Sequence, residues 1–201
     1  MNTTEKGTNF EKKVLAIVQQ LIASNQFCVS GNYWEVFHQK SYYGNLRKSE
    51  IIVDISVEFR RTPTADPSLI VFIECKDYIS SVPVNDVEEF YAKVNQMTGL
   101  NVKAMLFVRS ALQAAAFDTA ASLGMAVVRI LEEDELCWLI ERTNKDLTTG
   151  IANSIALNVM NALVNEHYVS IKQDTFARYK ETATYHLEDI FQAMAAEQEA
   201  Q

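Results

Sequence analysis

The chain has 201 residues, of which 48% are hydrophobic and 22% charged, and its formal net charge is -8. This length supports one complete hydrophobic core. The first ten residues are polar and no run of 18 apolar residues occurs, so we expect a cytoplasmic protein with no membrane partner. Cys28, Cys75 and Cys137 are widely spaced and never form a CxxC pair, which argues against a disulfide framework and a zinc site.

The acidity bears on the kind of partner that the surface can attract. Residues 1–150 and residues 151–201 each carry a net charge of -4. Proteins that hold nucleic acid by neutralising its phosphates usually have a basic surface, so this balance weighs against such a partner. Three short basic pairs remain as candidates for phosphate contact: Lys12-Lys13, Arg47-Lys48 and Arg60-Arg61.

The first half of the chain predicts a helix followed by strands. Apolar residues recur at helical spacing from Thr8 to Ser24. Glu11 lies on the same stripe as those apolar residues, where a carboxylate is costly unless it is paired or binds a metal; an interaction with the start of the helix is the alternative. The segment Tyr33–His38 is typical of a short strand.

Two longer strands follow, and they form a predicted hairpin. Residues 51–59 alternate strictly, so that Ile51, Val53, Ile55, Val57 and Phe59 are expected on one face and the polar residues on the other. Residues 69–76 are apolar on both faces, as in a central strand, and carry charges only at their end. The turn between these strands contains Pro63 and Pro67.

The next elements alternate between helix and strand. A helix is expected from Asn85, with Glu88 completing a capping box, to the region of Gly99. Further periodicity predicts a strand over 102–108, a helix over 112–123 and a strand over 125–131. This alternation implies crossovers onto a common sheet, and the order α-β-β-β-α-β-α-β defines an α/β fold. Beyond residue 131 we expect helices over 132–142, 151–166 and 173–198, with a role in packing or self-association.

The hairpin brings acidic residues together. If it is symmetric about Thr64, Asp54 faces Glu74 across the ladder and Glu58 faces Ile70. Directly opposed like charges destabilise a sheet, and a cation between them is the natural remedy. Alternation also places Glu74 and Lys76 on one face of their strand. Two converging carboxylates and a lysine are what Mg²⁺-dependent hydrolysis of a phosphodiester requires, because Mg²⁺ prefers oxygen ligands and acidifies the water that it retains.

These residues resemble a known superfamily. An Asp near a strand end, about 20 residues and then Glu-x-Lys on the next strand is the signature of PD-(D/E)XK nucleases, although Val53 stands where the superfamily has Pro. The run from FEKKV through IIVDISVEF and FIECKDY to AMLFV resembles the Mrr-like restriction endonuclease branch over residues 7–131. The resemblance implies a restriction-endonuclease-like mixed sheet flanked by helices in residues 1–145, with residues 146–201 as a helical C-terminal extension.

The same resemblance implies the roles of the residues. Asp54 and Glu74 would bind Mg²⁺, with Mn²⁺ as a substitute, while Lys76 assists the attacking water and Glu11 serves as an accessory acid. The protein would then be an endodeoxyribonuclease that acts in restriction or defence. Glu58 is left open between a ligand for a second metal ion and a solvated strand residue.

Two other functions compete with a DNA endonuclease. The charge of -8 favours a non-catalytic nucleic-acid-binding or assembly module that retains the nuclease fold. Action on RNA or on a nucleotide is the third reading. A homo-oligomer formed through the C-terminal helices is compatible with all three. His38, His167 and His186 have no neighbouring His or Cys in the sequence and are interpreted as surface or core histidines.

Overall fold

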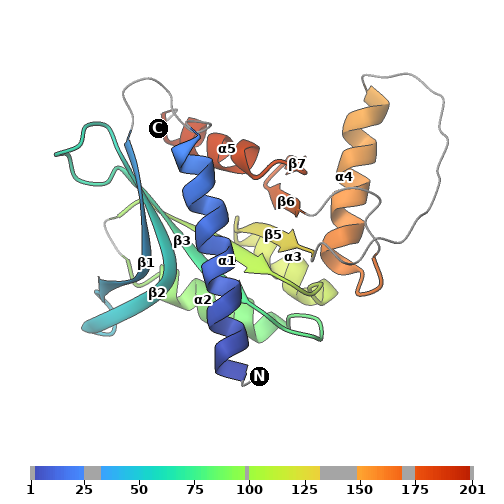
Figure 1. Cartoon of the computed structure of the whole chain (residues 1–201), viewed down its shortest axis with the longest axis horizontal. Coiled ribbons are helices and arrows are strands. Elements are labelled where there is room, and N and C mark those ends of the chain that lie inside the picture. Colours follow the sequence, from blue (N-terminus) through green and yellow to red (C-terminus); the bar gives the residue numbers. More distant parts are fainter. Residues whose placement is uncertain (1–2, 25–32, 98–99, 132–148, 169–174, 200–201) are drawn as a thin grey trace.

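The computed structural model describes residues 3–24, 33–97, 100–131, 149–168 and 175–199. These residues form a mixed seven-stranded sheet in the order β1-β2-β3-β4-β5-β6-β7, flanked by helices (Figure 1). The strands are β1 (Tyr33–Gly44), β2 (Ser49–Arg60), β3 (Leu69–Lys76), β4 (Val102–Val108), β5 (Ala126–Ile130), β6 (Thr175–Tyr179) and β7 (Thr182–Thr184). The helices are α1 (Thr3–Ala23), α2 (Val84–Val94), α3 (Ala114–Ser122), α4 (Thr149–Val164) and α5 (Leu187–Glu199).

The direction of the strands divides the sheet into three parts. β1, β2 and β3 are antiparallel neighbours, β3, β4 and β5 run parallel, and β6 and β7 continue as antiparallel strands. α2 and α3 connect the parallel strands, as a parallel arrangement requires. The mixed α/β class and the expected element order are therefore confirmed as far as β5.

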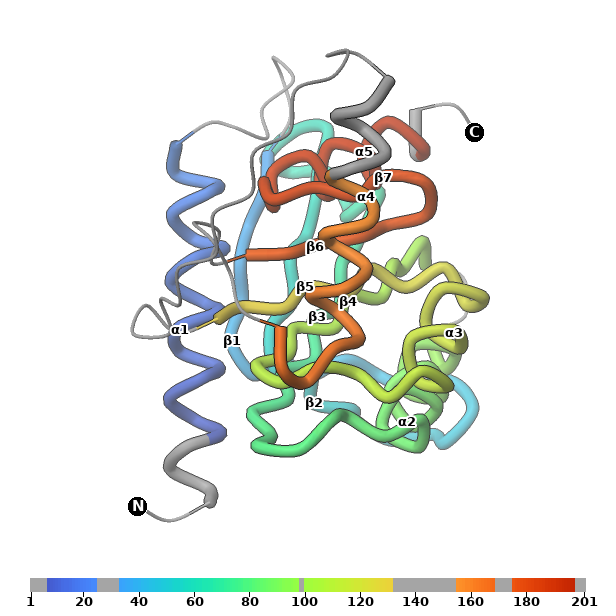
Figure 2. The backbone as a smooth tube through the Cα atoms, turned by 90° about the vertical axis from the view of Figure 1, so that its right-hand side faces the viewer, coloured from blue at the N-terminus to red at the C-terminus, as the bar shows by residue number. Residues whose placement is uncertain are grey.

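Helices cover both faces of the sheet. α1 and α5 pack on one face, here called the α1 face, and α2, α3 and α4 pack on the opposite one, the α2 face; Figure 2 shows α1 separated from α2 and α3 by the strands. On the α1 face the apolar stripe of the first helix packs against the last helix and the sheet, through Phe10, Val14, Val18, Ile190, Phe191 and Met194. On the α2 face the helical core residues include Val87, Phe90, Ala116, Phe117, Val159 and Leu163.

Two sequence predictions are wrong in local detail. Asn85 does not cap α2, because Pro83 is the N-cap residue and no side chain caps the helix. Residues 173–198 are not one helix, since β6 and β7 occupy 175–179 and 182–184 and only the remainder forms α5. Both strands are short, and each contains an alanine, which is not typical of strands, so the sequence did not indicate them. β6 pairs with β5, so the C-terminal segment extends the sheet.

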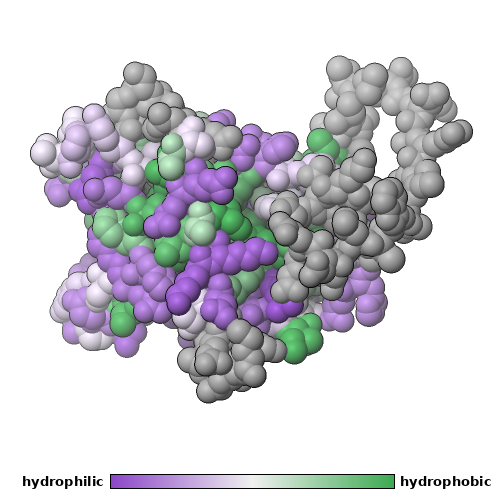
Figure 3. Space-filling view, viewed as in Figure 1, coloured by the Kyte–Doolittle hydropathy of each residue, from purple (hydrophilic) through white to green (hydrophobic). Residues whose placement is uncertain are grey.

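The other C-terminal predictions have mixed outcomes. The helix expected over 151–166 is confirmed as α4, whereas 132–142 lies outside the described residues, as do Cys28 and Cys137. α4 and α5 both bury apolar residues in the core, which accords with a packing role and leaves self-association as a prediction. In the part of the chain described here, no helix combines the length and apolarity needed to cross a membrane. Hydrophilic side chains cover much of the face seen in Figure 3, with hydrophobic ones visible between them.

Candidate active site

Asp54 lies where β2 and β3 separate. The ladder between these strands runs from Phe59 opposite Leu69 to Ile55 opposite Ile73, which confirms the register symmetric about Thr64. Asp54 and Glu74 are the next residues on each strand beyond the last ladder pair. There the Asp54 carboxylate turns toward β3, and its Oδ2 accepts the backbone N–H of Cys75 at 2.9 Å. The Asp54 side chain thus takes the place of the backbone hydrogen bond that would have continued the ladder.

This insertion changes the faces of the hairpin. Ile55, Val57 and Phe59 lie on the α1 face, but Ile51 and Val53 lie on the α2 face. The prediction that all five share one face is therefore wrong. Opposite Asp54, Gln39 is likewise absent from the β1–β2 ladder and has a φ of 50°. Regular alternation would have pointed the Asp54 carboxylate out of the sheet plane. Both β1 and β2 therefore interrupt their alternation at the point where this carboxylate enters the gap between β2 and β3.

Asp54 lies among other negative charges. Its burial, together with the negative charge of Glu74, raises the pKa of Asp54 from 3.8 to about 6, even though the hydrogen bond from Cys75 acts in the opposite direction. Glu11 adds a smaller repulsion of the same sign. Three acids thus act on one another electrostatically, and a cation placed among them would relieve this repulsion.

Glu74 is buried and held by two lysines. Lys93 on α2 donates to Oε1 at 3.0 Å and to Oε2 at 3.1 Å, and Lys76 lies 3.1 Å from Oε1. Burial alone would lower the pKa of Lys76, but the charge of Glu74 and a hydrogen bond to it outweigh burial and raise that pKa. Lys76 therefore stays protonated at neutral pH and can act as a hydrogen-bond donor and a positive charge, rather than as a base.

Glu11 on α1 is turned toward β1, at the strand position opposite Asp54. Its Oε2 lies 3.2 Å from Nε2 of His38 and 3.2 Å from Nε2 of Gln39. The Glu11 side chain is only 18% exposed. The Glu11 carboxylate is therefore paired, as expected for an acid on this stripe, and its partners are a histidine and an amide. His38 therefore belongs to the surroundings of the acids, which its isolation in the sequence did not indicate.

Glu58 is engaged by three side chains of the β1–β2 hairpin. Its two carboxylate oxygens are bound by Lys40, Arg60 and the hydroxyl of Tyr42, the last at 2.8 Å. Burial would raise the pKa of Glu58, but the hydrogen bonds from Lys40 and Tyr42 and the charge of Lys40 outweigh burial and lower that pKa. The structure therefore assigns Glu58 to the support of the β1–β2 hairpin.

The remaining carboxylates suit Mg²⁺ better than a metal ion that takes all its ligands from the protein. Within the described ranges, no three His, Cys, Asp or Glu side chains gather into a group that could hold a metal ion. Mg²⁺ commonly takes one or two carboxylates and completes its shell with water and substrate phosphate. Asp54 and Glu74 offer two carboxylates of this kind, and Glu11 would lie outside such a ligand set.

The three basic pairs differ in how exposed they are and in whether they form ion pairs. Lys12 and Lys13 are exposed on α1 beside Glu11, and Arg47 and Lys48 are exposed at the end of the β1–β2 hairpin. Arg60 is occupied by Glu58, Glu35 and the carbonyl of Ala65, so it is a poor candidate for phosphate contact.

Sequence reasoning also missed Lys93. The signal was available, because Lys93 follows Phe90 by three residues, and Phe90 is buried on α2. A lysine there calls for an acidic partner, just as Glu11 does on α1.

Comparison of the chain with models of known protein families found no match, and comparisons with curated proteins and with solved structures likewise found none.

Proposed function

We propose that this protein is a Mg²⁺-dependent nuclease with a restriction-endonuclease-like fold, which hydrolyses phosphodiester bonds of DNA at Asp54, Glu74 and Lys76. The observation that carries the proposal is the electrostatic repulsion between the half-buried Asp54 and the buried Glu74 at the point where β2 and β3 part. One carboxylate has a raised pKa, and the other has two lysines within hydrogen-bond distance. Buried like charges are expensive as a structural device alone, which favours a functional reason for keeping them.

Each residue has a role that follows from its surroundings. Asp54 and Glu74 would hold the metal ion, and the hydrogen bond from Cys75 fixes the direction of the Asp54 carboxylate. When bound, Mg²⁺ supplies neutralisation of phosphate charge and a more acidic water. Lys76, kept protonated by Glu74, donates a hydrogen bond to the attacking water or to a phosphate oxygen. Lys93 places a second positive charge beside the same carboxylate oxygen of Glu74 that Lys76 contacts.

Glu11 and His38 form a second pair near Asp54. Their side chains are 18% and 30% exposed, so solvent reaches them more easily than it reaches Glu74. Glu11 adds negative charge at the edge of the site and can orient water there, while His38 and Gln39 fix its carboxylate. This is the accessory role that the resemblance implies for Glu11.

Cleavage of supercoiled plasmid DNA in Mg²⁺ tests the proposal. We expect wild-type protein to nick or linearise the plasmid, and Asp54→Asn and Lys76→Met each to lose at least about a hundredfold in rate. Lys103→Met is the matched control, because Lys103 also pairs with a glutamate, Glu197, but lies near the start of β4. Loss of cleavage equally in the control, or cleavage that persists in Asp54→Asn, would reject this assignment.

A non-catalytic nucleic-acid-binding module is the second candidate. It is favoured by the ion pairs of Glu74 with Lys76 and Lys93, which offset the negative charge of this carboxylate. The same protein preparation distinguishes the two candidates. A module would bind DNA in EDTA and leave DNA and RNA intact in Mg²⁺ or Mn²⁺, whereas cleavage of RNA alone would reassign the substrate and keep the chemistry.

A further inference from the structure

Asp86 places a further carboxylate beside Lys76. It lies in the first turn of α2, where its Oδ1 is 3.9 Å from Nζ of Lys76. The side chains of Asp86 and Lys76 are 16% and 17% exposed, so this contact is largely shielded from solvent. Nζ of Lys76 also lies 3.1 Å from Oε1 of Glu74. Lys76 thus has one carboxylate within hydrogen-bond distance and a second one just beyond it.

α2 supplies both Asp86 and Lys93 to the surroundings of Glu74. Asp86 precedes the buried Phe90 by four residues and Lys93 follows it by three, so the three residues share one stripe of the helix. An acid in the first turn of a helix is stabilised by the helix dipole. The backbone N–H of Asp86 donates to the carbonyl of Pro83 at 3.3 Å. The backbone of Asp86 is therefore held by regular structure.

One oxygen of the Asp86 carboxylate lacks a hydrogen bond. Among the residues that the structure describes, Oδ2 of Asp86 is buried and has no hydrogen-bond partner. A buried acceptor without a donor costs free energy, and the cost is greater when the group is charged. The Asp86 carboxylate therefore has capacity for a further donor, and Lys76 is the cation within ion-pair distance of it in the described part of the chain.

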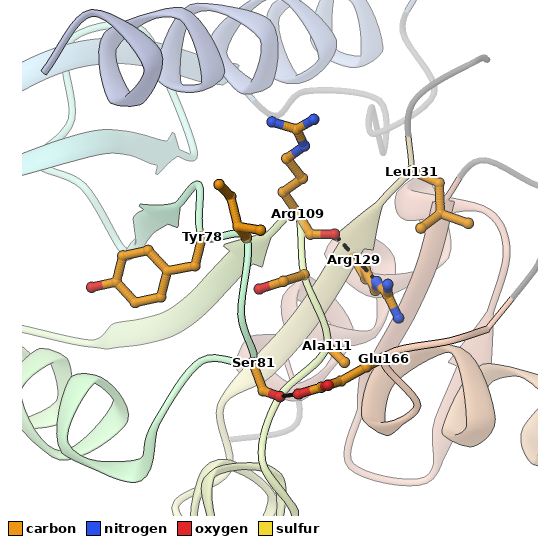
Figure 4. A pocket seen from close by; sticks show the side chains of 9 residues that line it. Tyr78, Ser81, Arg109, Ala111, Arg129, Leu131 and Glu166 are labelled. Atoms are coloured by element: carbon orange, nitrogen blue, oxygen red, sulfur yellow. Dashed lines mark hydrogen bonds between the residues drawn. The ribbon is translucent and has the colours of Figure 1, made fainter. Parts of the chain in front are cut away.

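Tyr78 is a second polar neighbour of Asp86. Burial, followed by interaction with Asp86, raises the pKa of the Tyr78 hydroxyl. Figure 4 shows the Tyr78 ring directed away from Arg109 and Arg129, which line the neighbouring cavity of about 200 Å³. A hydroxyl is neutral, so Tyr78 does not offset the negative charge of Asp86. Lys76 is the group that can do so.

Lys76 and the proposed metal ion have the same partner. Lys76 and Lys93 both contact Oε1 of Glu74, which also binds Mg²⁺ on the proposed function. A lysine that left Glu74 without another partner would be a largely buried, unpaired charge, which is costly. Asp86 removes that cost for Lys76. A shift of about 1 Å in this flexible side chain brings Nζ from 3.9 Å to hydrogen-bond distance from Asp86.

We propose that Asp86 is a positioning residue, which holds Lys76 when Glu74 binds the metal ion. The inference rests on the proposed function and adds a residue to its machinery. Lys76 exchanges one carboxylate partner for another and so remains paired. An ammonium group has three donors, so the remaining N–H groups of Lys76 can donate to the attacking water or to a phosphate oxygen. Asp86 itself touches neither and acts through Lys76.

The test measures the Mg²⁺ concentration at the midpoint of thermal stabilisation. We expect Asp86→Asn to need about fivefold more Mg²⁺ than wild type, because Lys76 then stays on Glu74 and competes with the metal ion. In a Lys76→Met background this competitor is absent, so adding Asp86→Asn should leave the midpoint unchanged. Glu88→Gln is the matched control, since it removes the same charge from an exposed position on α2 and should keep the wild-type midpoint.

The double-mutant comparison separates positioning from a simple effect of charge. If Asp86 acts only through its charge, Asp86→Asn will weaken Mg²⁺ binding equally with and without Lys76, which overturns the inference. If Asp86 only supports the start of α2, the variant will melt at a lower temperature in EDTA and keep the wild-type midpoint, which also overturns it. Asp86→Ser is the second variant, so that the result does not depend on how an asparagine fits this position.

The proposed function is judged separately by plasmid cleavage. Cleavage by wild type together with an unchanged midpoint in Asp86→Asn would remove the positioning role and leave the nuclease assignment in place. A midpoint that depends on Asp86 through Lys76, without cleavage of DNA or RNA by wild type, would support the exchange of partners and remove the nuclease assignment. A wild-type protein that neither Mg²⁺ nor Mn²⁺ stabilises would overturn the inference, whatever the result of the cleavage assay.

Discussion

β2 carries two acids four residues apart, the buried Glu58 and the half-buried Asp54, and their surroundings have opposite effects on them. Glu58 faces Glu35 across the β1–β2 ladder, but Arg60 contacts both carboxylates and Lys40 adds a further positive charge. Asp54 has two acids in its surroundings, and its pKa is raised. Positive charge therefore offsets the charge of Glu58, whereas Asp54 has too little positive charge nearby to offset its acidic neighbours. On the proposed function, that difference separates a structural carboxylate from one that binds the metal ion.

Removal of the satisfied acid should have the largest effect on folding. We expect Glu58→Gln to destabilise the protein by about 3 kcal/mol, because it leaves Lys40 and Arg60 near a buried site without a negative charge. That loss corresponds to a melting temperature lower by roughly 6 to 12 °C for a chain of this size. Asp54→Asn, measured without metal, should equal or exceed wild-type stability, because it removes repulsion. A loss of stability in Asp54→Asn as large as that in Glu58→Gln would contradict the distinction between the two acids.

The two acids should also give opposite responses to pH. Folded Asp54 holds its proton more tightly than the unfolded chain does, so its contribution is fully present below pH 3.8 and is lost as pH rises through about 6. The difference amounts to about 2 to 3 kcal/mol. Glu58 has a lowered pKa, so its contribution is present above its ordinary value of 4.5 and is lost as pH falls. Urea unfolding in EDTA from about pH 3 to about pH 7 measures both effects.

The variants assign those responses to single residues. Subtraction of the Asp54→Asn curve from the wild-type curve should leave a stability that falls with pH, and subtraction of the Glu58→Gln curve should leave one that rises. Two differences of the same sign would contradict the pKa shifts from which the comparison starts.

Lys93 sharpens the comparison, because it supplies to Glu74 the positive charge that a metal ion would otherwise supply. Lys93→Met should bind Mg²⁺ about fivefold to tenfold more tightly, since one competing cation is removed. The measurement is the Mg²⁺ concentration at the midpoint of thermal stabilisation. Lys103→Met serves as the control and should keep the wild-type midpoint. An unchanged midpoint in Lys93→Met would mean that the lysine and the metal ion do not compete.

The smallest effect is expected at Glu11. Glu11→Gln should fold normally and cleave DNA roughly tenfold more slowly, a milder loss than at Asp54, because Glu11 lies outside the metal-ligand set. The rate is measured against Mg²⁺ concentration, with His38→Gln as a companion variant that tests whether Glu11 acts through its contact with His38. Superimposable curves for Glu11→Gln and wild type would reduce Glu11 to an acid near the start of α1.

Sequence patterns predicted the hairpin register but not what happens at its end. The register followed from the turn, and Ile55 does lie opposite Ile73. Strict alternation failed at Asp54, because a side chain took the place of a backbone partner, and periodicity cannot detect such a substitution. The contact of His38 with Glu11 joins residues 27 positions apart. Such a contact depends on how α1 lies across the sheet, which local patterns do not determine.

The end of the chain was the least predictable region. β6 and β7 have five and three residues, too few for alternation to be distinguished from a helical pattern. β6 pairs with β5 and β7 pairs with β6, so their strand structure depends on the tertiary fold. In contrast, β3 and β4 were predicted with their observed bounds, because apolar residues run almost continuously along central strands.

The shared core of α1 and α5 has a consequence for synthesis of the protein. Phe10 and Val14, beside the earliest acid of the site, belong to the same apolar cluster as Ile190 and Met194, and the ring centroids of Trp34 and Phe191 are 6.2 Å apart. Contacts so distant in sequence form late and slow folding. A nascent chain on the ribosome therefore carries every proposed catalytic residue long before it can bury its first helix fully, and full assembly of the site must wait until translation has passed Met194.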